Sequence, residues 1–240
     1  MNNLNKQFNH SIIVDFPIDY NLYPLSKNVD IIKIVLEKDE YIIIPPFWFH
    51  WVYTDPETIA ISYEIFSLSG EDKFLYNSFY NNIPIKCNGN KTNIIYDDFI
   101  NSSLNNNFLA VLSKTSDCSP VIKDNNIKMS TNDTLLNIIK YVNNKNMYAY
   151  IGNEPIKNIK SIEEYIDITK LINLDDTLTI KYNVKLWLNL KKSINSGLHY
   201  DENAKFLYVL TGKKTFYLIH PKEKNNLYLQ LLPILPSFVI

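Results

Sequence analysis

Residues 184–221, VKLWLNLKKSINSGLHYDENAKFLYVLTGKKTFYLIHP, contain the pattern that decides the fold class. Three short runs in this stretch are rich in β-branched and aromatic residues, as strands are. They cover Val184–Leu190, Phe206–Leu210 and Thr215–Ile219, and the last two are joined around Thr211-Gly212-Lys213-Lys214. The last third of the chain is therefore predicted to be β structure.

The first third has the same character. Its apolar runs are separated by prolines, which interrupt regular structure. The expected strands are Ile12–Val14, Ile31–Leu36, Tyr41–Ile44 and Thr58–Phe66. Short strands at both ends of the chain predict one β-sandwich or jelly roll, built from both ends, with helical additions.

The middle of the chain, residues 69–178, is rich in asparagine and serine and differs from both ends. Apolar residues at helical spacing predict a helix over Asn132–Asn143, with Thr131 or Asn132 as its cap. A second helix is predicted from Ser161, where Ser161 and Glu164 fit a capping box. No Gly/Ser linker divides the chain, so we expect one domain made of residues 1–68, 69–178 and 179–240.

Charge and composition limit the partners. All 24 basic residues are lysine, they face 25 acidic residues, and the formal net charge is -1. There is no basic field to attract nucleic acid, and no arginine to read base edges or clamp phosphates. We therefore expect a nucleic-acid partner less than a protein or peptide partner.

Two further features concern location. The apolar run Leu227–Ile240 is shorter than the roughly 20 residues that a membrane-spanning helix needs, and the first ten residues are polar. Cys87 and Cys118 have no nearby Cys or His and fit neither a metal knuckle nor a disulfide framework. We expect a soluble protein of the cytoplasm or nucleus with free thiols, neither secreted nor membrane-spanning.

His199 and Asp201 are the first candidates for chemistry. They stand two positions apart, and on a strand such residues point to the same face. An adjacent imidazole and carboxylate make two thirds of the 2-His-1-carboxylate triad that holds non-haem Fe(II). A His-x-Asp pair is also common near surface turns, so the neighbouring sequence has to distinguish a metal site from a surface pair.

That context resembles the metal-binding half of the JmjC and cupin-like 2-oxoglutarate oxygenases. The family carries a Leu-Trp-Ile-Gly-like strand, a Ser/Thr-x-x-His-x-Asp element, another strand, and Gly-x-Lys before an apolar strand that ends in proline. Here the matching residues are Leu186-Trp187, Ser196 to Asp201, Gly212-Lys213-Lys214 and Pro221. Within the family the chain is most similar to the asparaginyl hydroxylases that act on hypoxia-inducible factor.

A second block, LEKDEYIIIPPFWFHWV at 36–52, is similar to the part of the family that carries the third metal ligand. In that block a strand leads to Ile-Pro, an aromatic pair and the distal histidine. The match assigns His50 as that ligand.

The two blocks stand in the opposite order to the family's, because His50 lies far before His199. Three accounts compete. We expect a circularly permuted double-stranded β-helix, because chains tolerate re-joining at exposed ends that lie close together. Alternatively, two degenerate modules leave no complete site. In the third account His50 of one subunit completes the site of another, which predicts a homodimer.

The resemblance implies Fe(II) bound by His199, Asp201 and His50, with 2-oxoglutarate as co-substrate. It assigns Lys214 to the far carboxylate of 2-oxoglutarate and Ser196 as a hydroxyl donor. The implied activity is a dioxygenase that hydroxylates or demethylates a protein or other macromolecular substrate.

The alternative is a catalytically inactive cupin-like module, used for binding or structure, with an incomplete metal site. Two more histidines, His10 and His220, are expected to be structural. The three tryptophans are expected to line the core or a pocket.

Overall fold

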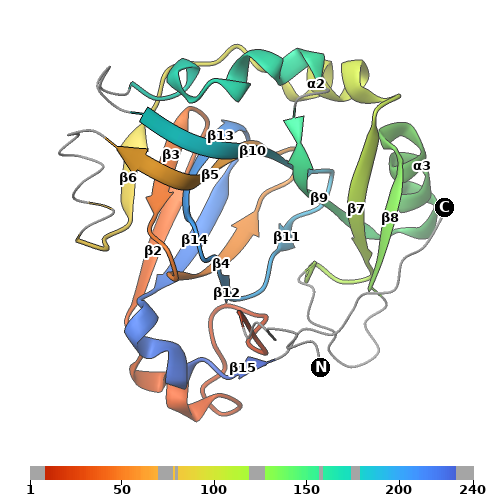
Figure 1. The fold of residues 1–240 in the computed structure, drawn as a ribbon. Helices are drawn as coiled ribbons and strands as arrows, with labels where there is room; N and C mark the ends of the chain where they lie inside the picture. The colour runs from red at the N-terminus through yellow and green to blue at the C-terminus, as the bar shows by residue number, and fades with distance from the viewer. Residues whose placement is uncertain are drawn as a thin grey trace, which may run out of the picture.

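The computed structural model of the 240-residue chain describes residues 9–69, 78, 81–118, 128–156, 159–173 and 179–230. Two antiparallel sheets make up most of it (Figure 1). The first contains β1 (His10–Ser11), β2 (Ile31–Leu36), β4 (Phe49–Thr54), β11 (Ile194–Asn195), β12 (His199–Tyr200), β14 (Lys214–Ile219) and β15 (Leu229–Gln230). The second contains β3 (Glu40–Ile44), β5 (Ile59–Ser69), β6 (Ile85–Asn88), β7 (Asn107–Ser113), β8 (Lys128–Thr134), β9 (Tyr148–Pro155), β10 (Thr179–Asn189) and β13 (Ala204–Thr211).

Strands from the two ends of the chain alternate in both sheets. In the first sheet β4 lies between β12 and β14, and in the second β5 lies between β10 and β13. Figure 1 shows this as red and orange strands lying beside blue ones. The expected sandwich assembled from both ends of the chain is confirmed, and its mainly β, cupin-like jelly-roll class with it.

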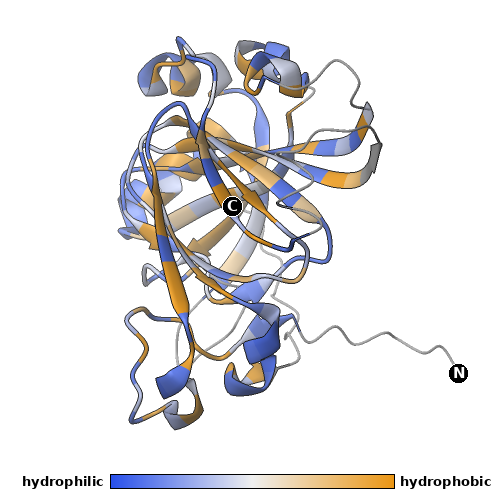
Figure 2. Cartoon of the chain, turned by 90° about the vertical axis from the view of Figure 1, so that its left-hand side faces the viewer, coloured by the Kyte–Doolittle hydropathy of each residue, from blue (hydrophilic) through white to orange (hydrophobic). Residues whose placement is uncertain are grey.

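Burial of apolar side chains explains why the sheets stack. A buried cluster between them takes Leu36 and Phe216 from the first sheet and Ile42, Ala60 and Val209 from the second. Apolar residues gather on the strands in the middle of the molecule (Figure 2). At roughly 25 cal/mol per Å² of apolar surface removed from water, such burial is the main force holding two sheets together.

The outer faces of both sheets are also covered. The second sheet packs against α2 (Tyr96–Ser103), α3 (Leu135–Lys145) and the 3-10 helices η3 (Lys160–Ile166) and η4 (Ile168–Lys170). The first sheet packs against residues of the N-terminal segment, such as Ile13 and Ile18, and against Leu227. Two further 3-10 helices, η1 (Pro24–Asn28) and η5 (Pro221–Asn226), lie at its end. Among the described residues, no helix is long and apolar enough to cross a membrane.

Three local predictions need correction. The strand expected at Ile12–Val14 is instead β1 at His10–Ser11, because the Ser11 hydroxyl accepts the Ile13 N–H at 2.9 Å and turns the chain out of the ladder. The helix expected at Asn132–Asn143 is α3, and Thr134 caps it by accepting the Asn137 N–H. Residues up to Thr134 pair with β7 instead.

The capping box expected at Ser161 does not form. Residues 160–166 make a 3-10 helix whose N-cap is Ile159, with no side-chain cap. Ile162 and Tyr165 are both buried and stand three apart, which is the period of a 3-10 helix. The middle of the chain is also less helical than expected, because β7, β8 and β9 extend the second sheet.

The turn between β13 and β14 requires glycine at position 212. Its φ is +73°, and a Cβ there would lie 2.8 Å from the Thr58 Cα. We expect Gly212→Ala to lower the free energy of unfolding by about 1–3 kcal/mol, as strained backbone positions do. Urea denaturation measures the effect. Lys213→Ala, at the neighbouring residue whose side chain pairs with Asp55, should cost clearly less, because exposed ion pairs contribute little. Equal losses for the two variants would contradict the explanation.

Candidate metal centre

Neighbouring strands of the first sheet bring His50, His199 and Asp201 together. In the ladder between β4 and β12, His50 stands opposite His199, and their ring centroids lie 4.3 Å apart. Asp201 follows β12 directly, and its Oδ2 lies 3.3 Å from His50 Nε2. One ligand atom from each residue lies within 4.8 Å of the others. All three belong to a single chain.

Hydrogen bonds to the backbone set the tautomer of both imidazoles. His50 Nδ1 lies 3.0 Å from the Trp48 carbonyl oxygen, and His199 Nδ1 lies 3.1 Å from that of Gly197. A carbonyl oxygen only accepts, so each Nδ1 carries the hydrogen. In the neutral ring, Nε2 is then left with a free lone pair, as in metal-bound histidines.

The charge states also suit a cation. Burial, together with the nearby His50, lowers the pKa of His199 well below its ordinary value. Burial alone would raise the pKa of Asp201, but His50 and the Lys205 ammonium together lower it below its ordinary range. A neutral imidazole and an ionised carboxylate are the forms that bind metal.

This donor set fits a divalent metal ion. His50 Nε2 lies only 3.3 Å from Asp201 Oδ2, which is close enough for one bound metal ion to contact both atoms. Two histidines and one carboxylate on one face are the ligands of non-haem Fe(II) sites with open positions.

A cavity of about 510 Å³ adjoins this cluster. His50, His199 and Asp201 line it, and so do both residues expected to bind the co-substrate, Ser196 and Lys214. Trp187 forms part of its wall, as expected, with its indole N–H donated to the Ser62 hydroxyl at 2.7 Å.

Lys214 is the most unusual charged group in the cavity. It is 1% exposed, and its Nζ donates to Thr54 Oγ1 at 3.0 Å and to the Tyr150 hydroxyl at 3.3 Å. No ion pair of Lys214 is found in the described part of the chain. Burial lowers the pKa of Lys214 to about 7. A buried ammonium without a counter-ion suits a ligand carboxylate.

Sequence reasoning missed the hydroxyls beside Lys214. Thr54 lies four residues after His50 on β4, so both side chains point to the same face, and this signal was available. Tyr150 comes from β9 in the middle third, where no motif marks it. The predicted donor, Ser196, lines the cavity, but its hydroxyl faces its neighbour's carbonyl oxygen, that of Gly197, at 3.4 Å.

His10, expected to be structural, lies in the cavity wall. It stands opposite His199 in the ladder between β1 and β12, and the two rings stack with centroids 4.9 Å apart. It is not part of the three-ligand cluster. His220 is structural, as expected, because its ring accepts the Lys222 N–H at the start of η5.

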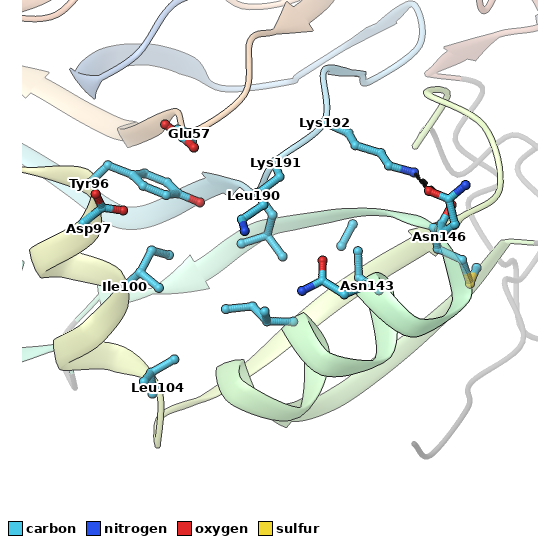
Figure 3. A pocket seen from close by; sticks show the side chains of 14 residues that line it. Glu57, Tyr96, Asp97, Ile100, Leu104, Asn143, Asn146, Leu190, Lys191 and Lys192 are labelled. Atoms are coloured by element: carbon cyan, nitrogen blue, oxygen red, sulfur yellow. Dashed lines mark hydrogen bonds between the residues drawn. The ribbon is translucent and has the colours of Figure 1, made fainter.

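A second cavity, of about 390 Å³, lies between α2 and α3 (Figure 3). Its lining is mostly apolar, and Lys192 at its rim donates to the Asn146 side chain at 2.6 Å. None of the three candidate ligands lines it. The candidate ligands and Lys214 line the first cavity instead.

Comparison with known families finds two matches along the chain. A model described as the JmjC domain, hydroxylase, matches residues 2–65, which include His50. A model described as the cupin-like domain matches residues 88–237, which include His199, Asp201 and Lys214. No curated protein and no solved structure matches the chain.

Proposed function

Because the chain belongs to the JmjC and cupin-like family, we propose that it is an Fe(II)- and 2-oxoglutarate-dependent dioxygenase. The observation that carries this proposal is the cluster of His50, His199 and Asp201 beside a cavity that contains the buried Lys214. One feature supplies the metal ligands, and the other supplies a cation for a dicarboxylate co-substrate.

Each residue of the site has a separate task. When bound, iron and the co-substrate 2-oxoglutarate would supply the chemistry by which O2 oxidises a substrate C–H bond. His50, His199 and Asp201 would hold the metal from one side and leave its other positions open. Lys214 would pair with the far carboxylate, while the hydroxyls of Thr54 and Tyr150 keep its Nζ in place.

We further infer that the two motif halves are circularly permuted. The tail after β14 lies against the segment that follows β1: Ser26 Oγ donates to the Asn226 carbonyl oxygen at 2.6 Å. The Ile12 N–H donates to the Tyr228 carbonyl oxygen at 3.2 Å. These contacts support a circular permutation, because they bring the tail next to the N-terminal segment into which it would continue in the family's order of motifs. Since the three ligands meet within one chain, no partner subunit is needed to complete the site.

The proposed substrate is a protein or peptide that is hydroxylated or demethylated. A nearly neutral chain without arginine offers little attraction for nucleic acid. Cys87 and Cys118 are both free thiols, which supports a reducing intracellular compartment.

One observation favours a second candidate, a cupin-like module without catalysis. Lys205 Nζ lies 2.6 Å from Asp201 Oδ2, so a side-chain cation already neutralises the candidate metal carboxylate. In a non-catalytic module this ion pair would be permanent.

Metal binding separates the two candidates. With Mn(II) at about 100 times its Kd, the dioxygenase should gain about 2.7 kcal/mol, which raises Tm by roughly 5–10 °C. Added 2-oxoglutarate should raise Tm further. Differential scanning fluorimetry measures both shifts, with His199→Ala expected to lose them and His220→Ala to keep them. A wild-type Tm that Mn(II) leaves unchanged would favour the non-catalytic module.

A further inference from the structure

Lys205 contacts the same oxygen of Asp201 that faces a candidate metal ligand. Its Nζ lies 2.6 Å from Asp201 Oδ2, and His50 Nε2 lies 3.3 Å from that oxygen. The two side chains of the ion pair are 13% and 25% exposed, so water screens them little. The lysine charge therefore sits at the edge of the space where a metal would bind.

The surrounding strands hold Lys205 in this place. It lies on β13, between Ile44 of β3 and Glu64 of β5 in the two ladders. Glu64 already has partners, because Lys185 Nζ lies 3.1 Å from its carboxylate and Asn203 donates to it at 3.2 Å. Among the described ion pairs, Asp201 is the partner of Lys205.

We propose that Lys205 acts as an internal counter-ion that competes with the metal for Asp201. This inference rests on the proposed function, since it concerns the same metal site. In the metal-free protein the ammonium balances the carboxylate. A divalent ion bound to His50, His199 and Asp201 repels that ammonium and has to displace it from Oδ2. Lys205 thus lowers the affinity of the site and sets the free metal concentration at which it fills.

Removing the lysine charge tests this directly. Lys205→Met keeps the apolar stem and removes the ammonium. We expect the full-length variant to bind Mn(II) on the order of tenfold more tightly than wild type in isothermal titration calorimetry. Its metal-free Tm should fall, because Asp201 loses its partner. Both readouts are independent of enzymatic turnover.

Lys185→Met is the matched control, because Lys185 lines the same cavity but pairs with Glu64. Its Mn(II) affinity should stay within about threefold of wild type. Lys205→Gln, which removes the charge but keeps a hydrogen-bond donor, provides the same test if the methionine variant does not fold.

The outcomes are distinct. Tighter Mn(II) binding by the Lys205 variants alone supports the proposal. If wild type binds Mn(II) and the Lys205 variants bind it equally or more weakly, the competition proposal is overturned and the proposed function still stands. If neither wild type nor variants bind Mn(II), both the competition and the dioxygenase proposal fail.

Discussion

Asp201→Ala is expected to reduce conversion of 2-oxoglutarate to succinate to background. Asp201 is the carboxylate of the candidate metal cluster, and its loss leaves two neutral imidazoles to hold a divalent ion. Loss of an outer-shell partner alone typically costs 10–100-fold in affinity or activity, so loss of a ligand should exceed about 100-fold. Succinate formation with Fe(II), 2-oxoglutarate and oxygen gives the measurement.

Two controls make that result specific. Glu202→Ala removes the adjacent, exposed carboxylate and should leave turnover near the wild-type rate. Asp201→Asn keeps the shape of the side chain, so it shows whether the loss comes from the charge or from local unfolding. Turnover by Asp201→Ala at the wild-type rate would remove Asp201 from the site.

Lys214→Met is expected to weaken binding of 2-oxoglutarate by roughly 30- to 4,000-fold. Truncating one partner of a buried, hydrogen-bonded charge pair costs about 2–5 kcal/mol, which corresponds to that range. The Mn(II) affinity should change little, because Lys214 contacts Thr54 and Tyr150 and none of the three candidate ligands. Calorimetric titration of the Mn(II)-loaded protein with 2-oxoglutarate measures the effect. An unchanged Kd for 2-oxoglutarate would place its far carboxylate elsewhere.

The same variant should change the pH dependence of stability. Burial lowers the pKa of Lys214 from about 10.5 to about 7, so the folded state disfavours the ammonium. Between these values the unfolded chain binds more protons at this residue, and the Lys214 contribution to the free energy of unfolding rises with pH. The penalty is complete below pH 7 and disappears towards pH 10.5. Lys214→Met should lack this rise, so the two unfolding curves are compared at pH 7 and pH 9.

If the stabilities of wild type and Lys214→Met change with pH in parallel, then burial does not lower the pKa of Lys214. Lys213→Met serves as the control, because the Lys213 side chain is 45% exposed and pairs with Asp55. Its stability should follow the wild-type curve across the same pH range.

The strands at the two ends of the chain were largely predictable. Ile31–Leu36 is β2 as predicted, and Thr215–Ile219 misses only the first residue of β14. These runs are rich in β-branched and aromatic residues, so the local signal alone predicts strands there. The 160–166 segment failed because a capping-box pattern is local, whereas burial of Ile162 and Tyr165 decides the helix type.

The candidate metal ligands could be predicted for a different reason. His199 and Asp201 are two apart on one chain segment, and His50 follows a proline-aromatic block, so both patterns are visible in the printed order. No sequence motif identifies Lys205 or Tyr150 as part of the site. Their importance depends on which strands become neighbours.

By itself, the sequence determined the β character of both ends of the chain, the histidines and carboxylate suited to a metal, and the lysine-only basic complement. Only the tertiary structure decided that His50 stands opposite His199, that Lys214 is buried between Thr54 and Tyr150, and that Lys205 reaches Asp201. The physical reason is that residue type and local periodicity act over a few positions. Strand pairing instead joins residues far apart in the chain, and burial then sets the charge and partners of each group.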